Sequence, residues 1–228
     1  MNIRLEKMIS SQNNWSRKQV KKEIKMGKVL VDNKIQKDPS FKINPLINEV
    51  IFNQEKIEYK EFVYIVLNKP KNYVCATKDN FQATVMELID QYSNLKLHIV
   101  GRLDKDTTGM VLLTNDGEWS HKLKSPKANI EKEYEVVLKH DFTESMLIKI
   151  QSEMILDNKI LKPIKIIKNE KNKCNIILTE GKYHQIKRMF HMVDNEVIEL
   201  NRIRIGKLNL KELELEIGAW KEIDENLI

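Results

Sequence analysis

One segment concentrates the residues that could do chemistry. Residues 101–117, GRLDKDTTGMVLLTNDG, contain three of the chain's seven glycines and place Arg102, Asp104 and Asp106 between the first two. The segment lies between the apolar stretches LHIV and VLLT, which we expect to be strands, so a carboxylate here can be held rigidly for catalysis. The commoner role of a loop aspartate is to hydrogen-bond its own backbone. Neither a G-x-G-x-x-G nor a G-x-x-x-x-G-K-[ST] pattern is present to indicate nucleotide binding.

Arginine is rare in this chain, which has 33 lysines and six arginines. A guanidinium binds phosphate or carboxylate through two parallel hydrogen bonds, which an ammonium cannot do. The arginines are therefore candidates for geometrically demanding roles, although some are expected to be ordinary surface residues. They are Arg4, Arg17, Arg102, Arg188, Arg202 and Arg204.

Charge is concentrated near the N-terminus. The net charge is +6, and residues 1–58 contribute 12 basic against 7 acidic residues, a net of +5. Ser16 is a candidate N-cap for a helix over 17–26 that ends at Gly27, and the pair Asp32-Asn33 predicts a hairpin turn. The helix carries a basic face that includes Arg17, Lys18 and Lys21. Such a face either binds nucleic acid or is simply solvated.

Several classes of protein are excluded by composition. No apolar run approaches the roughly 20 residues of a membrane span, and no signal peptide is recognisable. Cys75 and Cys174 lie far apart, without a CxxC motif or a Cys/His cluster, so neither structural zinc nor a disulfide framework is expected. We expect a cytoplasmic protein that does not bind a membrane and holds no metal ion.

The remaining elements must position residues 101–117. Residues 40–62 are interpreted as the end of the basic module and a linker. Beyond them, five apolar segments predict strands: YIVLNKP, LHIV, EYEVVL, CNIILT and EVIEL. Helices are expected at 84–92, 118–124, 143–152 and 184–193. This interleaving predicts an α+β (mixed α/β) fold with a largely antiparallel sheet.

Residues 4–35 resemble the small RNA-binding domain first described in ribosomal protein S-four. Arg4, Ser16, Arg17, Gly27 and the Val-x-Val hairpin occupy the positions of that pattern. The resemblance implies binding to RNA phosphates and shape through Arg4, Arg17, Lys18 and Lys21. We therefore predict two domains, an RNA-binding domain at 1–58 and a second domain at 59–228.

The segment GRLDKDTTGMVLLTNDG resembles the signature of pseudouridine synthases of the ribosomal small-subunit synthase A family. Met110 is a mild departure at a leucine position, and in NKPKNY Asn72 replaces a glycine. Asn is the next best residue for a left-handed backbone. The likeness extends from Asn68 to Ile223 and also includes LTEGKYHQIKRMF and the NRIRIG run. It implies the pseudouridine synthase fold for 59–228.

The resemblance also implies roles. Asp104 is the essential carboxylate, Lys187 is the basic residue beside it, and Tyr134 packs on the flipped base. Arg102 fills the position that the base leaves or holds a flanking phosphate, and His184 and Gln185 line the pocket or contact RNA. Arg188 is a further RNA-binding candidate, and Arg202 and Arg204 either contact RNA or form salt bridges. Isomerisation adds and removes nothing overall, so no cofactor is expected.

The predicted function is therefore the isomerisation of one uridine in small-subunit (16S) ribosomal RNA, by resemblance uridine 516. The substrate would be the 16S precursor or the assembling small subunit, and the enzyme is expected to be a monomer. Two alternatives remain open at this point. One is a large-subunit (23S) rRNA pseudouridine synthase, and the other is a non-catalytic rRNA-binding assembly factor.

Overall fold

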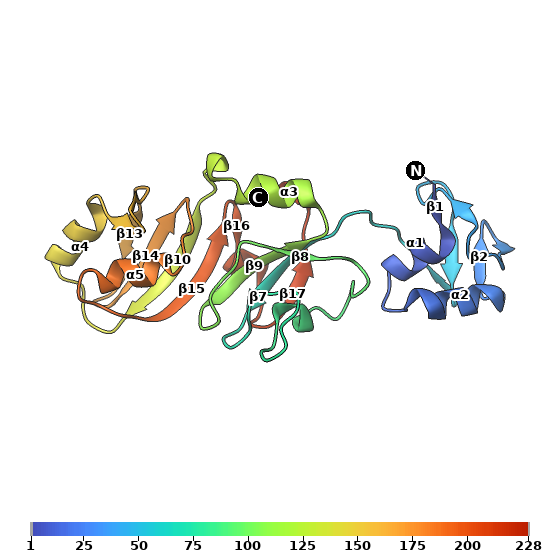
Figure 1. Cartoon of the computed structure of the whole chain (residues 1–228), viewed down its shortest axis with the longest axis horizontal. Helices are drawn as coiled ribbons and strands as arrows, with labels where there is room; N and C mark the ends of the chain where they lie inside the picture. The colour runs from blue at the N-terminus through green and yellow to red at the C-terminus, as the bar shows by residue number, and fades with distance from the viewer. Residues whose placement is uncertain (1, 228) are drawn as a thin grey trace. The chain divides into compact units, whose positions relative to one another are not determined.

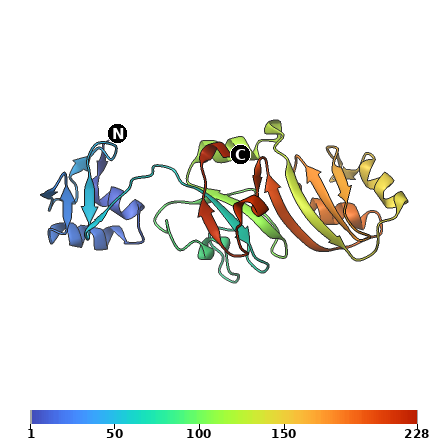
Figure 2. The ribbon, with the colours of Figure 1, turned by 180° about the vertical axis from the view of Figure 1, so that it is seen from behind.

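The structure is a computed structural model that describes residues 2–227. It divides into two compact units (Figures 1 and 2). The N-terminal unit comprises residues 2–63 together with Ile89–Leu97, and the C-terminal unit comprises Tyr64–Leu88 and residues 98–227. Among the described residues, no helix is long and apolar enough to span a membrane.

The N-terminal unit combines two short helices with small antiparallel sheets. Strands β2, β3, β5 and β6 form one sheet in the order β3-β2-β5-β6, and β1 pairs with β4. The elements are β1 (Ile3–Arg4), α1 (Leu5–Ser11), α2 (Arg17–Lys25), β2 (Val29–Val31), β3 (Lys34–Ile35), β4 (Lys42–Ile43), β5 (Val50–Phe52) and β6 (Glu55–Lys56).

Local sequence signals account for the start of α2 and for the hairpin after it. The Ser16 side chain accepts a hydrogen bond from the Gln19 backbone, and the Gln19 side chain accepts one from the Ser16 backbone, so a capping box starts α2. Asp32 and Asn33 both adopt left-handed backbone conformations, with φ of 50° and 62°, as a tight hairpin requires. The predicted helix and hairpin are confirmed.

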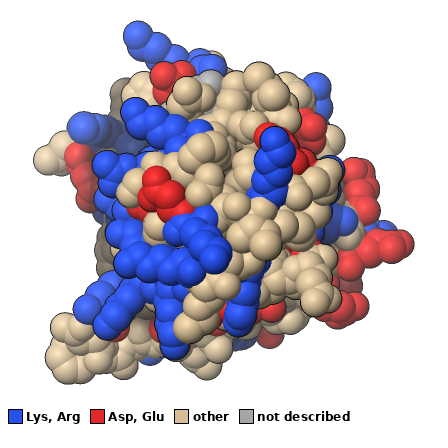
Figure 3. Space-filling view, turned by 90° about the vertical axis from the view of Figure 1, so that its right-hand side faces the viewer, with Lys and Arg blue, Asp and Glu red and all other residues tan. Residues whose placement is uncertain are grey.

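Basic side chains gather on the surface of this unit, as the space-filling view from its side shows (Figure 3). Four lysines of α2 border one shallow depression, and Arg4 and Arg17 border another together with Lys7 and Lys42. The four α2 lysines are Lys18, Lys21, Lys22 and Lys25.

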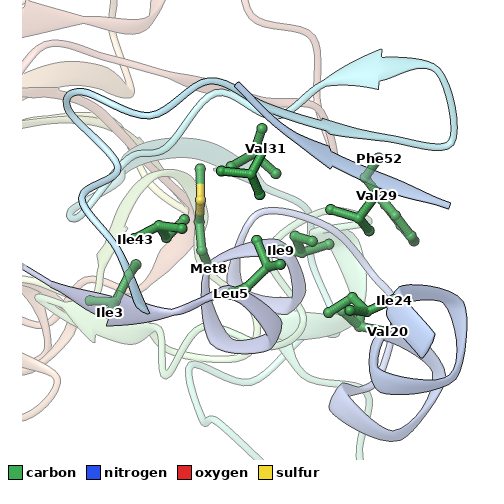
Figure 4. Packing of buried hydrophobic residues seen from close by; sticks show 11 residues of the cluster. Ile3, Leu5, Met8, Ile9, Val20, Ile24, Val29, Val31, Ile43 and Phe52 are labelled. Carbon is green, nitrogen blue, oxygen red and sulfur yellow. The ribbon is translucent and has the colours of Figure 1, made fainter. Parts of the chain in front are cut away.

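The core of the N-terminal unit shows that residues 42–56 belong to the basic module, as its predicted extent of 1–58 requires. The apolar faces of α1 and α2 pack against β2, β4 and β5 (Figure 4), and Val50 and Phe52 are buried in that cluster. The chain stays attached to the unit beyond residue 58, because the Gln12 side chain donates to the Lys60 carbonyl and accepts from the Lys60 amide.

The C-terminal unit is built around a nine-stranded mixed sheet with the main order β13-β14-β10-β15-β9-β7-β17. Its strands are β7 (Tyr64–Lys69), β8 (His98–Val100), β9 (Thr108–Thr114), β10 (Lys132–Leu138), β13 (Lys165–Lys168), β14 (Lys173–Leu178), β15 (Val197–Ile205), β16 (Leu208–Asn209) and β17 (Trp220–Glu222). The pair β11 (Ile155–Leu156) and β12 (Lys159–Ile160) forms a separate hairpin. The predicted mixed α/β class with a largely antiparallel sheet is confirmed.

The parallel contact between β9 and β15 joins the two halves of the large sheet. Gly109 lies at this contact with φ of 105°, and a Cβ there would come within 2.3 Å of the Arg202 carbonyl oxygen. Only glycine permits so close an approach of two backbones. The conformation of Gly109 therefore brings Arg202 on β15 beside the strand that follows the 101–107 loop.

The helices of the C-terminal unit are short. They are α3 (Gly117–Lys124), α4 (Glu144–Gln151), α5 (Gln185–His191) and α6 (Leu210–Leu213), with 3₁₀ turns η1 (Val85–Leu88), η2 (Pro126–Ala128) and η3 (Glu225–Leu227). The helix predicted over 84–92 was wrong in length. Thr84 and Glu87 do form the capping contact, but only a 3₁₀ turn follows, and the backbone at Tyr92 is left-handed with φ of 59°.

Candidate active site

Asp104 lies on the loop between β8 and β9, and residues of β7 and of the segment after it hold the backbone of this loop through hydrogen bonds. The Lys69 side chain at the end of β7 is fully buried, and its Nζ donates to the carbonyls of Pro70 at 2.9 Å and Lys105 at 3.2 Å. The Asn72 amide donates to the same Lys105 carbonyl at 2.9 Å, with Asn72 at φ of 72°, as its place in a glycine position predicts. The Leu103 amide donates to the Cys75 sulfur.

Lys69 is a functional candidate that the sequence reasoning missed. The NKP segment ends a predicted strand and belongs to the family resemblance, but neither observation assigns a role to its lysine. An isolated buried ammonium is unfavourable, and here burial lowers the pKa of Lys69, opposed by Cys75, Asp106 and Asp104. Its position between β7 and the Asp104 loop depends on the β7–β9 pairing, so no local signal could have identified it.

Helix α5 supplies the cation that meets the loop. Lys187 Nζ lies 3.0 Å from Asp104 Oδ2 and 2.6 Å from Asp106 Oδ1, and His184 Nε2 lies 3.4 Å from Asp104 Oδ1. Burial lowers the pKa of Lys187, but hydrogen bonds to both carboxylates outweigh this and raise it. Burial by itself would raise the pKa of Asp106. The hydrogen bond and charge of Lys187 more than offset this effect, so the pKa of Asp106 lies below its ordinary value. The lysine is thus ionised beside its carboxylates at neutral pH.

Tyr134 and Arg202 form the second half of the site, on neighbouring strands in register. The Tyr134 side chain is buried, and its hydroxyl accepts a hydrogen bond from Arg202 Nη1 at 3.4 Å. Arg202 is 1% exposed and also donates to the carbonyls of Met110 at 2.7 Å and Gly101 at 2.9 Å. It forms no ion pair within residues 2–227, and it lines the cavity described below.

Other predicted residues are held by partners within the protein. Arg204 pairs with Glu131 and Glu133, which fits the salt-bridge alternative. Arg188 forms a two-pronged pair with Asp157 at 2.7 and 3.0 Å. The buried Gln185 donates to Glu180 and accepts from the Lys182 amide, so it braces the turn before α5. These contacts assign structural work to all three; their RNA contacts stay predictions.

A cavity of about 460 Å³ opens above Asp104 and Tyr134. Its walls come from the 101–107 loop, β10, β15, the end of β14 and the start of α5, and they include His184, Gln185, and the apolar Leu112, Leu178 and Ile205. Seven cationic side chains line it, against the two carboxylates of Asp104 and Glu180. The cations are Arg102, Lys124, Lys132, Lys162, Lys182, Lys187 and Arg202.

The cavity reverses the impression given by overall charge. The second domain is nearly neutral as a whole, yet seven of its basic residues line a cavity that contains only two carboxylates. Lys132 is the most isolated of them. Burial lowers the pKa of Lys132, and the positive charges of Arg202 and Lys162 lower it further. A pocket of this kind suits a polyanion that presents one flat, uncharged group to the floor.

A mixed sheet that holds a carboxylate beside a lysine, at the wall of a cavity lined by cations, fits an enzyme that acts on a nucleic acid. Within the described residues, no three His, Cys, Asp or Glu side chains are grouped to hold a metal. The RNA pseudouridylate synthase family model matches residues 63–192, and the S4 domain model matches residues 3–45. The chain belongs to the RNA pseudouridylate synthase family and carries an N-terminal S4 domain.

Relatives match over nearly the whole chain. The ribosomal small subunit pseudouridine synthase A of Escherichia coli is 36% identical over 99% of this chain and 98% of its own length. The Yersinia pestis protein of the same name is 38% identical over 97% and 94%. An RNA pseudouridine synthase of Bacillus subtilis, YtzG, described as uncharacterized, is 37% identical over 98% and 95%. A crystal structure of a pseudouridylate synthase superposes with a TM-score of 0.68 at 36% identity, over 98% of this chain and 96% of that one.

Proposed function

We propose that this pseudouridine synthase modifies small-subunit ribosomal RNA at the uridine equivalent to position 516. The names and near-complete coverage of the Escherichia coli and Yersinia pestis relatives support the small subunit over the large one. The observation that carries the catalytic part of the proposal is the contact of Lys187 with Asp104 at the wall of a basic cavity of about 460 Å³. A non-catalytic assembly factor would not need that arrangement.

In the reaction, the bond between ribose C1′ and uracil N1 breaks, and a bond between C1′ and C5 forms. The proton on C5 is lost to solvent and N1 gains one, so the reaction is balanced without a co-reactant. Asp104 is the group that acts on the ribose or the uracil ring, and the Lys187 ammonium lies 3.0 Å from its carboxylate. His184 contacts the other carboxylate oxygen and limits its rotation.

The target base must leave its stack to reach Asp104, at a cost of a few kcal/mol. Tyr134 lies at the cavity wall on the strand facing the Asp104 loop and offers its ring to the flipped uracil. Arg202 donates to the Tyr134 hydroxyl and to the carbonyls of Met110 on β9 and Gly101 after β8, so it positions Tyr134 relative to the Asp104 loop. Arg102 lines the cavity with an exposed side chain and is free to meet RNA at the rim.

The S4 domain is proposed to bind rRNA by its phosphates. The depression bordered by the α2 lysines carries no acidic residue. Replacing Lys18, Lys21, Lys22 and Lys25 by glutamine should weaken rRNA affinity and flatten its dependence on salt. The rate on a saturating short RNA should be unchanged, because the active-site residues all lie in the C-terminal unit.

The decisive experiment is tritium release from small-subunit rRNA transcripts labelled at uracil C5. Wild type should release tritium and Asp104→Asn should not, whereas equal release by both would refute the role of Asp104. Carbodiimide primer-stop mapping of rRNA from a deletion strain should then show one missing stop at the proposed uridine. A missing stop in large-subunit rRNA instead would refute the substrate assignment.

A further inference from the structure

The turn before α5 presents an aromatic ring that nothing in the fold requires. Tyr183 is 74% exposed, so its ring contributes little to the apolar core. It lies in the turn from Lys182 to Gln185 and outside the residues that line the cavity, although both of its neighbours line it. The ring therefore lies at the rim of the cavity.

The ring is nevertheless held in a defined place. It stacks on the imidazole of His184 with centroids 3.9 Å apart and planes 16° from parallel. Its carbonyl accepts a hydrogen bond from Arg188, which is itself fixed by the two-pronged pair with Asp157. An exposed side chain that is ordered by its neighbours loses little conformational freedom when a ligand binds to it.

His184 connects this ring to the reaction centre. One edge of its imidazole meets Asp104 at 3.4 Å, while one face carries Tyr183. His184 adopts a left-handed backbone, with φ of 49°, which is uncommon for histidine and is found where the surroundings over-determine it. The Tyr183 ring thus stacks directly on the residue that contacts the Asp104 carboxylate.

The surroundings favour a nucleic acid as the ligand. The carboxylates near this turn are all engaged, Asp104 and Asp106 by Lys187, Asp157 by Arg188 and Glu180 by Gln185. Lys182 of the same turn donates to the Lys159 carbonyl and forms no ion pair among the described residues, so it adds a cation beside the ring. A ring beside several cations is suited to a base whose phosphates lie nearby. An apolar peptide would gain nothing from those charges.

We propose that Tyr183 is a stacking site for the base that flanks the target uridine in the RNA. When the uridine leaves its stack, each neighbouring base loses one stacking partner. The Tyr183–His184 pair replaces that partner at the rim of the cavity and so stabilises the flipped state. This inference rests on the proposed function, because it presupposes an RNA uridine in the cavity.

The test measures tritium release and RNA binding with the full-length enzyme on three RNAs. One RNA is intact, and the others carry an abasic site immediately 5′ or 3′ of the labelled uridine. The variants are Tyr183→Ala, Tyr183→Phe, which keeps the ring, and Ile148→Ala, which truncates another exposed side chain on α4 away from the cavity. Tyr183 is exposed, so its truncation should leave folding intact.

On intact RNA, Tyr183→Ala should lower kcat/KM and affinity by about 5- to 150-fold, the range measured for stacking of one base. The Phe and Ile148 variants should stay within about twofold of wild type on the same scale. On the abasic RNA that lacks the stacked base, wild type should fall to the level of Tyr183→Ala and the variant should fall no further. The abasic site that gives this result identifies the flank.

Two results would overturn the inference. If Tyr183→Ala lowers activity by the same factor on all three RNAs, with kcat reduced and affinity unchanged, Tyr183 only orients His184. If the variant matches wild type on intact RNA, the ring has no role. Absence of tritium release from wild type on intact RNA would instead refute the proposed function, and the stacking site with it, so the two failures are distinguishable.

Discussion

Lys69 offers the sharpest test of how the fold supports the site, through the replacement Lys69→Met. Its ammonium makes two charge-assisted hydrogen bonds, at 2.9 and 3.2 Å, each contributing about 1.5–3 kcal/mol. The gross stabilisation of about 3–6 kcal/mol is opposed by a desolvation penalty of several kcal/mol for the buried ion. Methionine has nearly the same shape and carries no such penalty. We therefore expect the free energy of unfolding to change by less than about 2 kcal/mol.

Activity should respond differently from stability. Lys69 holds the Lys105 carbonyl, and Lys105 lies between Asp104 and Asp106 on the loop. Without that anchor the carboxylate can shift, and a displacement of 1 Å is enough to reduce a rate about 100-fold. We expect kcat in single-turnover tritium release to fall by about that factor, while the affinity for RNA changes little.

The pH dependence of stability provides a second signature. Burial lowers the pKa of Lys69 in the folded state, so between that lowered value and 10.5 the unfolded chain binds more protons at this residue. Stability therefore rises with pH across this window, and the contribution is smallest below it. Lys69→Met lacks the titrating group. The unfolding free energy of wild type should therefore increase relative to that of the variant as pH rises toward 10.5.

The matched control is Lys71→Met, two residues along the chain. Lys71 is 48% exposed and lies 3.8 Å from Glu199, so its replacement should alter stability by less than about 0.5 kcal/mol and leave kcat unchanged. Urea unfolding and single-turnover assays on both variants decide the matter. An unchanged kcat in Lys69→Met, or a loss of stability above about 4 kcal/mol, would refute the reasoning.

Three further predictions concern the same site. Lys187→Ala should raise the pKa of Asp106, because the cation that lowers it is gone. In wild type, this pair stabilises the fold above the ordinary pKa of an aspartate, and the stabilisation is lost as pH falls through the lowered pKa of Asp106. Acid unfolding of the variant should lack this loss of stability. Lys132→Met should weaken RNA binding and reduce the salt slope of log affinity by about one, as measured by filter binding. Gly109→Ala should destabilise by about 3–5 kcal/mol in urea unfolding, because its Cβ would overlap the backbone of Arg202.

Each of these has a control or a contrary outcome. An unchanged salt slope for Lys132→Met would mean that this lysine does not meet a phosphate. Gly117→Ala is the control for Gly109, since nothing lies within 4 Å of a Cβ at Gly117, and equal effects at both glycines would contradict the packing argument. Retention of the acid-side loss of stability in Lys187→Ala would place its origin elsewhere.

Local signals in the sequence were reliable where the structure depends on neighbouring residues. The Ser16 N-cap, the Asp32-Asn33 hairpin and the left-handed Asn72 are all confirmed, because each depends on backbone conformations within a few residues. Where the module ends within 40–62 was not visible locally, because Val50 and Phe52 are buried by helices more than 20 residues away. The length of the helix after Thr84 was misjudged because a capping pair determines where a helix starts but not where it ends.

The sequence by itself determined that Asp104 belongs to a glycine-flanked segment between two strands and that the chain resembles pseudouridine synthases. Only the tertiary structure decided what surrounds the carboxylate. Lys187 is 83 residues away and approaches it because α5 packs near β15, and Arg202 points inward because Gly109 allows β9 and β15 to meet. Lys69 is buried beneath the loop by the β7–β9 pairing. Strand pairing over long separations creates these contacts, and residue types along the chain do not encode it locally.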